Sequence, residues 1–344
     1  MMQTESMNLE LSLEDFIVFR DFIHEKCAMY FAENKKYLLE NRLSKRIATL
    51  GLKSYQDYFY QVKYDTTLKE FNMLMNLVTT NEISFFRNPP QLKSFQEEVL
   101  PLVLKRKKEQ GLPRRLKLWS AGCSTGEEPY TLAIIALEVL GERTLWKVEI
   151  IANDISENVL YAARKGIYNE MTLRSTPRPV LNRYFTKDGN RYLVNENVKR
   201  LVKFTHLNLA DRRKLALIND IDIVFCRNVM IYFSDEIKKA IVRNYYNALR
   251  PGGYFFIGHS ESLHGISKAF KLVYFQNALV YHREPGTAGE RPRRAAAVAA
   301  EVKELAPVGK AAAATPGATA TAHEGDTTMD KLKKIQELLA KTRK

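Results

Sequence analysis

The stretch WSAGCSTGEEPY (119–130) contains the residue types best suited to hold a ligand. It follows an apolar run and precedes a helical pattern. Gly122 and Gly126, beside small residues, would let the backbone turn approach a ligand closely. The turn lacks the lysine of the G-x-x-x-x-G-K-[ST] phosphate loop and the full G-x-G-x-x-G dinucleotide pattern. ATP hydrolysis and hydride transfer are therefore disfavoured.

Acidic residues near this turn narrow the class of ligand. Asp154 follows the next predicted strand, where a carboxylate can accept both ribose hydroxyls of an adenosine. Its alternative role is to cap the helix predicted at 156–166. Glu127 and Glu128 suit a helix N-terminus electrostatically. The same carboxylates would repel a pyrophosphate but could bind an ammonium or lie near a sulfonium, which favours S-adenosylmethionine over NAD or ATP.

A second polar cluster lies in CRNVMIYF (226–233), directly after a predicted buried strand. Ligands bind at such strand ends in open α/β sheets. Arg227, Asn228 and Tyr232 are polar groups in an otherwise apolar run, which is unusual for a purely structural strand end. A nucleophilic role for Cys226 is disfavoured because a free cysteine is most often a small buried hydrophobic residue.

Two further segments contain candidate groups. In NEISFFRNPPQ (81–91), Arg87 could clamp a carboxylate bidentately or be an ordinary surface arginine. Pro89-Pro90 predicts a helix start. The segment GHSESLHG (258–265) contains His, Ser and Glu, but no G-x-S-x-G elbow accompanies them, so a hydrolase triad is disfavoured.

An α/β domain would position these groups. From residue 116 short apolar runs alternate with helical stretches, which is typical of parallel βα units. A terminal hairpin is predicted around Gln276-Asn277. An antiparallel β insertion is predicted at about 178–206, with a Lys-Asp-Gly-Asn turn between two arms and VKRLVKFTHL as a third. The predicted strands are 116–121, 147–152, 220–226 and 254–259, and the predicted helices are 128–141, 156–166 and 234–253.

Helical and low-complexity segments flank this domain. Apolar spacing of three and four residues without proline predicts about four helices in an N-terminal domain, 8–80, and 81–115 would join it to the α/β domain. Gly51 would end one of these helices. The Ala/Thr/Pro/Gly-rich stretch 285–328 is a predicted linker. The segment 329–344 is a predicted basic amphipathic helix that could be a solubilising tail or a docking helix.

Composition limits the class of protein. The 344 residues are 45% hydrophobic and 27% charged, as in globular proteins, and the net charge of +14 would suit nucleic acid, an anionic membrane or an acidic protein. The three cysteines form no CxxC pair, so neither a disulfide framework nor a zinc cluster is indicated, and a reducing cytoplasm is expected. No signal peptide and no apolar run of about 18 residues is found. We therefore expect neither signal-directed export nor a membrane span.

The order of motifs resembles one family. TTNEISFFR, LWSAGCSTGEEPYTLA, ANDISENVL, HLNL, CRNVMIYF and GHSESL follow a helical N-terminal domain, as in the chemotaxis receptor methyltransferases of the CheR family. The resemblance implies a Rossmann-like class I S-adenosylmethionine methyltransferase domain at 116–284. It also implies cytoplasmic methylation of receptor glutamates to methyl esters, with S-adenosylhomocysteine as product.

The resemblance also implies roles for particular residues. Arg87 and Tyr232 would be catalytic and would orient the incoming carboxylate and the cofactor. Ile83 stands where family members often carry threonine. No general base is required because a glutamate of reference pKa about 4.3 is already ionised at neutral pH, and no metal is expected. The implied cofactor contacts are Asn81, Ile83, Arg87, Gly122, Glu128, Asp154, Asn208, Leu209, Cys226 and Arg227.

Receptor contacts are implied at two further places. One stripe of the helix predicted at 35–50 is basic and could meet the acidic receptor helix or be a solvated face. In some relatives the β insertion binds a short receptor C-terminal peptide. A partner for the C-terminal helix is also conceivable. The residues of the basic stripe are Lys35, Arg42, Lys45 and Arg46.

Two other functions stay open at this point. A methyltransferase acting on RNA or a small molecule would suit the positive charge, but no aromatic-rich basic stretch or nucleic-acid motif is present, so a nucleic-acid partner is not expected. A degenerate methyltransferase fold could serve as a signalling adaptor through its C-terminal helix. The intact set of Gly122, Gly126, Asp154 and Arg227 argues against this second alternative.

Overall fold

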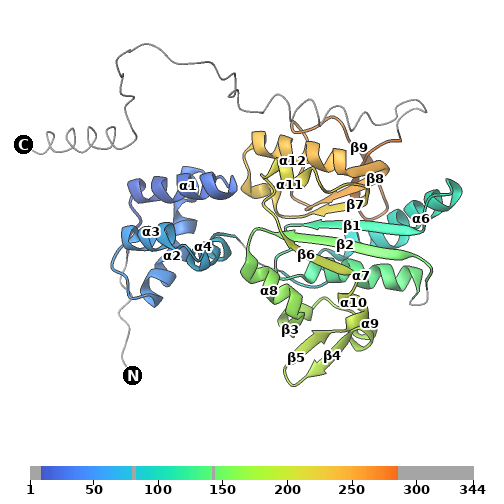
Figure 1. Ribbon diagram of the computed structural model, residues 1–344, viewed down its shortest axis with the longest axis horizontal. Helices are drawn as coiled ribbons and strands as arrows, with labels where there is room; N and C mark the ends of the chain where they lie inside the picture. The colour runs from blue at the N-terminus through green and yellow to red at the C-terminus, as the bar shows by residue number, and fades with distance from the viewer. Residues whose placement is uncertain (1–8, 80–82, 142–143, 286–344) are drawn as a thin grey trace, which may run out of the picture. The chain divides into compact units, whose positions relative to one another are not determined.

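The computed structural model describes residues 9–79, 83–141 and 144–285. Its N-terminal part contains the four expected helices and a short 3₁₀ turn, η1 (Glu33–Lys35) (Figure 1). The Ser12 side chain caps the first helix by accepting from the amide of Asp15. Gly51, at φ +68°, follows the end of the second helix as predicted. The helices are α1 (Leu13–Cys27), α2 (Lys36–Thr49), α3 (Tyr55–Tyr64) and α4 (Lys69–Val78).

The larger part is built on a seven-stranded sheet with the order β6-β2-β1-β7-β8-β10-β9. Strands β6 to β8 in this order are parallel, and β10 pairs antiparallel with both β8 and β9. The mostly parallel sheet with a C-terminal antiparallel hairpin confirms the predicted fold class. The strands are β1 (Arg115–Ala121), β2 (Lys147–Asp154), β6 (Val202–His206), β7 (Ile221–Cys226), β8 (Leu249–Ile257), β9 (Lys271–Tyr274) and β10 (Leu279–His282).

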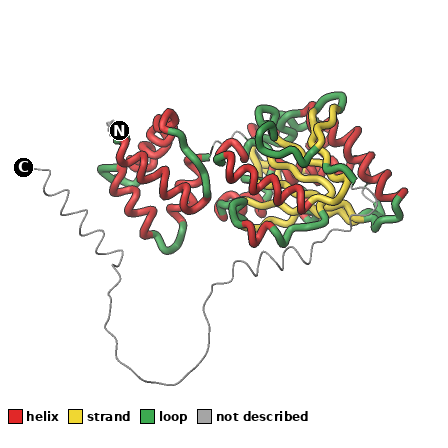
Figure 2. Tube along the Cα trace, turned by 90° about the horizontal axis from the view of Figure 1, so that it is seen from above, coloured by secondary structure: helices red, strands yellow, loops and turns green. Residues whose placement is uncertain are grey.

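Helices cover both faces of this sheet because successive strand residues point to opposite sides. Figure 1 shows α12 on one side and α7 on the other, and Figure 2 shows the strands flanked by helices. Trp119 packs edge-on against Tyr245 of α12, with ring centroids 4.9 Å apart. Its neighbour Leu118 belongs to the cluster on the α7 side. The helices are α5 (Pro89–Ser94), the π-helix η2 (Phe95–Val99), α6 (Leu100–Glu109), α7 (Glu127–Leu140), α8 (Glu157–Lys165), α11 (Arg212–Leu215), the 3₁₀ turn η4 (Met230–Tyr232) and α12 (Asp235–Ala248).

The local predictions of turns agree with the structure. The terminal hairpin turns at Gln276-Asn277, where the amide of Phe275 donates to the carbonyl of Ala278. Helix α5 begins at Pro89, with proline in its first two positions. Both signals are local, so the sequence alone could report them.

The β insertion differs from the prediction in its third strand. Strands β4 (Phe185–Asp188) and β5 (Arg191–Val194) form the expected hairpin, but the third strand is β3 (Ile167–Asn169), antiparallel to β5. The predicted third arm is β6, which pairs in parallel with β2 at the edge of the large sheet. There Val202 joins the core against α7, which the small sheet would not provide. The remaining elements of this region are η3 (Met171–Leu173), α9 (Arg178–Tyr184) and α10 (Glu196–Lys199).

The helix predicted at 234–253 ends earlier than expected. Helix α12 stops at Ala248, and Pro251, Gly252 and Gly253 lie within β8. Gly252 donates to the carbonyl of Arg283, and the amide of Arg283 donates to the carbonyl of Gly253. Because the chain beyond β10 supplies these partners, the Pro-Gly-Gly segment joins the sheet instead of forming a free turn.

The C-terminal predictions lie outside the described residues. These are the linker 285–328, apart from its first residue, and the amphipathic helix 329–344. Within the described ranges, no helix combines the length and apolar character needed to cross a bilayer.

Candidate active site

A pocket lies at the carboxyl ends of β1, β2 and β7, where open α/β sheets bind ligands. Its wall includes side chains from the loops after these three strands and from helices α1 and α4 of the N-terminal domain. Predicted residues that line it are Ile83, Arg87, Gly122, Glu128, Asp154, Asn208, Leu209, Arg227 and Tyr232. The fold therefore brings most of the predicted site together.

The turn after β1 requires its two glycines. Gly122 has φ +75°, and a Cβ there would lie 2.5 Å from Cγ2 of Val229 in the loop after β7. Gly126 has φ +95°, and its Cβ would lie 2.9 Å from that of Ala163. The carbonyl of Asn153 accepts from the amides of Gly122 (2.9 Å) and the next residue. The turn is thereby held against β2 with its backbone close to the pocket.

Asp154 connects the loops on both sides of the pocket. Its carboxylate accepts from the amides of Ser124 (2.9 Å) and Ser156 (3.0 Å), and the residue also lines the pocket. Burial raises the pKa of the Asp154 carboxyl, and these amide bonds oppose the rise. A carboxylate has about four acceptor positions, so it retains acceptor capacity for hydroxyl groups of a ligand. The alternative of helix capping alone does not account for its place in the pocket wall.

Glu128 and Arg227 form the charged end of the pocket. Glu128 Oε1 accepts from the hydroxyl of Ser120 (2.7 Å), and its Oε2 lies 3.4 Å from Nη1 of Arg227. Nη2 of Arg227 donates to the carbonyl of Arg87 (2.7 Å). Burial raises the pKa of Glu128 and lowers that of Arg227, and each charge opposes the shift of the other. The Arg87 segment is thereby tied to the loop after β7.

The two glutamates at the start of α7 have different environments. Glu127 is buried away from the pocket lining, and both of its carboxylate oxygens accept from the hydroxyl of Thr125 (2.9 and 2.7 Å). Glu128 faces the pocket. Only the second of the two predicted carboxylates is therefore placed to meet a ligand.

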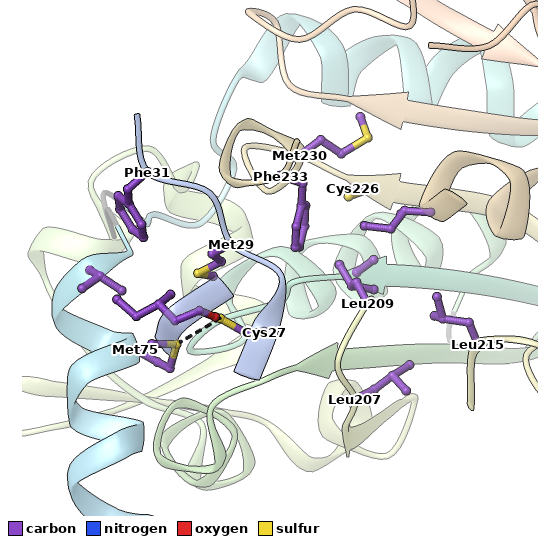
Figure 3. Close-up of a cluster of buried hydrophobic side chains, with 14 of the residues drawn as sticks. Cys27, Met29, Phe31, Met75, Leu207, Leu209, Leu215, Cys226, Met230 and Phe233 are labelled. Carbon is purple, nitrogen blue, oxygen red and sulfur yellow. Dashed lines mark hydrogen bonds between the residues drawn. The ribbon is translucent and has the colours of Figure 1, made fainter. Parts of the chain in front are cut away.

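The N-terminal domain contributes one wall of the pocket. The amide of Tyr30 donates to the carbonyl of Tyr232 (2.8 Å), and the side chain of Asn208 donates to the carbonyl of Lys26 (3.2 Å). On another side, the hydroxyl of Ser156 donates to Asn76 of α4 (3.0 Å). Figure 3 shows the apolar part of this wall, with Cys27, Met29 and Met75 of the helical domain near Phe233 and Leu209.

Two predicted cofactor residues are not brought to the site. Cys226 is fully buried at the end of β7, does not line the pocket, and belongs to the apolar cluster of Figure 3. Burial raises the pKa of its thiol well above the ordinary value. The pocket lining therefore includes Arg227 but not Cys226, because this strand position points into the core. Asn81 lies outside the described residues.

The predicted basic stripe does not form one free face. Arg46 makes a two-pronged ion pair with Glu70 of α4, with bonds of 2.9 and 2.7 Å. Arg42 donates to the carbonyl of Val78 (2.5 Å). Lys45 is exposed on α2, and Lys35 is exposed but belongs to η1, before that helix. The two arginines thus hold α2 to α4, whereas the two lysines face solvent.

The structure also reveals residues that sequence reasoning missed. Asn153 is fully buried, accepts from the indole of Trp119 (2.7 Å) and donates to the carbonyl of Leu207 (3.3 Å). Its position directly before Asp154, at the end of a predicted strand, could have identified Asn153 as a site residue. Val229 also lines the pocket, next to Asn228, which the sequence did single out as a polar group and which has φ +60°. Met29, Met75 and Asn76 gave no signal, because their partners are distant in the sequence.

The lining suits a nucleoside that carries a charged amino-acid end. Asp154 supplies an acceptor at one end of the β2 loop, and Glu128, Arg87 and Arg227 supply charges of both signs. Between them lie apolar side chains, including Ile155, Val159 and Leu209. Over the described ranges, no group of three or more His, Cys, Asp or Glu side chains is arranged to hold a metal ion.

Comparison with known proteins identifies two family domains in the chain. Residues 81–279 match the family model described as "CheR methyltransferase, SAM binding domain", and residues 14–79 match "CheR methyltransferase, all-alpha domain". S-adenosylmethionine is thus the cofactor that the pocket serves.

Curated relatives match the chain over most of its length. A chemotaxis protein methyltransferase 2 of Vibrio cholerae is 34% identical, over 78% of this chain and 92% of its own. A chemotaxis protein methyltransferase 1 of Pseudomonas aeruginosa is 35% identical, over 78% and 97%. A chemotaxis protein methyltransferase of Vibrio parahaemolyticus is 34% identical, over 79% and 98%. With both family domains present in order, this chain belongs to the CheR family of S-adenosylmethionine-dependent methyltransferases.

Proposed function

We propose that this protein methylates glutamate side chains on the cytoplasmic helices of chemoreceptors, forming glutamate methyl esters, and that it acts in the cytoplasm. The observation that carries the proposal is the pocket wall formed by Glu128, Asp154 and Arg227, in a chain that aligns with chemotaxis protein methyltransferases over nearly their whole length. S-adenosylmethionine supplies a methyl group activated by its sulfonium.

The pocket suits transfer to an acceptor that is already charged. A glutamate carboxylate of reference pKa about 4.3 needs no general base near neutral pH. Among the described residues that line the pocket there is neither histidine nor lysine. The remaining tasks are to align the carboxylate with the methyl group and to exclude water. Arg87 and Tyr232 are proposed to orient the acceptor carboxylate and the cofactor.

Cofactor contacts are assigned by position in the pocket. Asp154 is proposed to accept the ribose hydroxyls, and Glu128 to meet the ammonium group. Asn208 and Leu209 are proposed to flank the adenine. Each of these residues lines the pocket, and Asp154 is fixed by the two amide bonds that it accepts.

The receptor surface is proposed to begin at the N-terminal helices. Lys35 and Lys45 are exposed and could meet acidic side chains of a receptor helix. Arg42 and Arg46, which bond to α4, are proposed to support this face by holding α2 in place. The net charge of +14 supports attraction toward an acidic protein substrate.

A second receptor contact is proposed at the small sheet. Its order β3-β5-β4 gives two edges, β3 and β4. An extended peptide can add a strand to such an edge. A receptor that ends in a flexible peptide could therefore be tethered there while its helices meet the active site.

Methyl transfer to purified receptor cytoplasmic fragments tests the function. Tritiated S-adenosylmethionine should label the fragment, and mild base should release the label as methanol, as expected of a glutamate ester. Asp154→Asn should abolish labelling at low cofactor concentration, whereas Asp235→Asn, which is exposed in the first turn of α12, should not. Label in RNA, or label that resists base, would reject the proposal.

The same assay tests whether the residues beyond Glu284 are needed for methyl transfer. A variant truncated after Glu284 keeps every residue that lines the pocket. Full activity of this variant would confine residues beyond 284 to localisation or regulation. Loss of receptor labelling with retained cofactor binding would place a receptor contact in that segment.

A further inference from the structure

Glu261 holds together two loops at the edge of the active site. Its Oε2 accepts from the amide of Asn228 (2.8 Å), in the loop after β7, and from the amide of Gly258 (2.7 Å), after β8. Its own amide donates to the carbonyl of Gly258 (3.0 Å). One carboxylate oxygen thus joins the ends of two neighbouring parallel strands.

The surroundings of Glu261 are built for a carboxylate. A Cβ at Gly258 would lie 2.6 Å from Oε2 of Glu261 and 3.1 Å from the amide nitrogen of Asn228. A side chain at position 258 would therefore crowd the oxygen on which both amides converge. Oε1 is buried and has no hydrogen-bond partner among the described residues. Within the same residues, no lysine or arginine forms an ion pair with Glu261, so the bonds that fix it are the two amides.

The loop that Glu261 holds forms one wall of the cofactor pocket. Arg227, Asn228 and Val229 all line the pocket. Asn228 has φ +60°, a left-handed conformation that costs free energy for a residue with a side chain. Val229 packs where a side chain on Gly122 would stand. The negative charge of Glu261 also supports the positive charge of Arg227, whose pKa burial lowers.

We propose that Glu261 is a positioning residue for cofactor binding, because its carboxylate fixes the strained loop 227–229 in the shape that completes the pocket. Hydrogen bonds to an ionised acceptor are stronger than those between neutral groups. Removal of the carboxylate would leave two amides without their acceptor and release the loop. The proposal deepens the cofactor-binding part of the function and does not depend on the identity of the methyl acceptor.

Titration of S-adenosylhomocysteine into the full chain by calorimetry tests the proposal. Glu261→Ala should weaken binding by about tenfold or more, since it leaves two amides unsatisfied. Glu261→Gln retains one acceptor oxygen without the charge and should bind with intermediate affinity. The control is Ser260→Ala, the exposed preceding residue, which should bind as the wild type does.

Amide hydrogen exchange gives a readout that is independent of affinity. In Glu261→Ala, exchange should accelerate in peptides that cover 226–233 and 257–261 and stay unchanged in the strands β1 and β2. If Glu261→Ala fails to fold, Glu261→Gln is measured in the same two ways. Wild-type affinity in Glu261→Ala, or binding by Glu261→Gln as weak as that of Glu261→Ala, would overturn the proposal. If the wild-type protein binds S-adenosylhomocysteine but does not label the receptor, the glutamate acceptor proposed above is rejected. The proposal for Glu261 would remain intact.

Discussion

Arg227 and Glu128 form an ion pair inside the cofactor pocket, with Nη1 3.4 Å from Oε2. Arg227 comes from the loop after β7 and Glu128 from the first turn of α7, so the pair joins two elements of the pocket wall. Arg227 also donates to the carbonyl of Arg87. The guanidinium is therefore the point at which three segments of the site meet.

Arg227→Met should damage both stability and binding. The substitution leaves the Glu128 charge without its cation and the Arg87 carbonyl without its donor, at a cost of about 1–3 kcal/mol. Binding of S-adenosylhomocysteine should weaken by about tenfold or more. In the double variant Arg227→Met/Glu128→Gln, stability should recover in part, because no unpaired charge remains although the Arg87 carbonyl still lacks its donor, whereas binding should not recover. Urea unfolding and calorimetry measure the two effects, and strictly additive losses of stability would contradict the coupling.

Gly122→Ala should distort the turn after β1 and push against Val229. The added Cβ would lie 2.5 Å from Cγ2 of Val229, and the backbone has φ +75°. We expect a loss of about 1–3 kcal/mol of stability and a fall in cofactor affinity. The matched control is Gly51→Ala, which has φ +68° but no atom within 4 Å of the added Cβ. It should lose about 1 kcal/mol and keep wild-type affinity, and equal affinities for both variants would contradict the prediction.

Features with local signals could be predicted from the sequence. The Gly-rich turn, the Asp after β2, the proline start of α5 and the Gln276-Asn277 hairpin each depend on a few adjacent residues. The alternation of strands and helices was equally visible, because burial imposes its own period on each element. The fold class followed from these signals, as did Gly122, Asp154 and Arg227 of the pocket, whereas Ile83, Asn208 and Leu209 were implied only by the family resemblance.

Features that depend on distant partners could not be predicted. Nothing near β6 indicated that it pairs with β2 instead of the insertion. Nor did the sequence show that Asp222, fully buried in β7, pairs with Lys107 of α6 (2.6 Å). The sequence placed Arg46 in a basic stripe on one helix face, but in the structure it pairs with Glu70 of α4. In each case an interaction between residues far apart in the chain decides the outcome, and one sequence does not reveal which residues meet.

Substitution of the lysines of the predicted basic stripe should affect receptor methylation, whereas substitution of Arg46 should affect stability. Lys35→Ala/Lys45→Ala should raise KM for receptor methylation several-fold and leave stability unchanged, because both side chains are exposed. Arg46→Ala should instead cost about 1–3 kcal/mol, since it leaves the mostly buried Glu70 unpaired. Steady-state kinetics against salt concentration and urea unfolding provide the measurements. An unchanged KM in the double lysine variant would show that Lys35 and Lys45 do not contribute to receptor binding.

Arg87 and Tyr232 are expected to act mainly on turnover. Both line the pocket, and the carbonyl of Tyr232 is fixed by the amide of Tyr30, so Tyr232→Phe removes a hydroxyl without releasing the backbone. Tyr232→Phe should lower kcat by about tenfold or more, with little change in affinity for S-adenosylhomocysteine. Arg87→Ala should lower both kcat and the affinity for S-adenosylhomocysteine. Wild-type turnover and affinity in both variants would reject the roles assigned to these residues.

Glu127 should make stability depend on pH. Burial raises the pKa of its carboxyl, against the hydrogen bond from Thr125. Above the unfolded-state pKa of about 4.3, the unfolded chain releases this proton while the folded chain retains it, so the free energy of unfolding decreases as pH rises until the folded-state pKa is passed.

Glu127→Gln removes this titration while retaining an acceptor for Thr125. The variant should therefore gain stability relative to the wild type as pH rises above the unfolded-state pKa of about 4.3. Thr125→Val should have the opposite effect and extend the decrease to higher pH, because it removes the bond that lowers the pKa of Glu127. Urea unfolding followed by circular dichroism at a series of pH values measures both. A difference between Glu127→Gln and wild type that stays constant with pH would show that the buried carboxyl does not titrate in this interval.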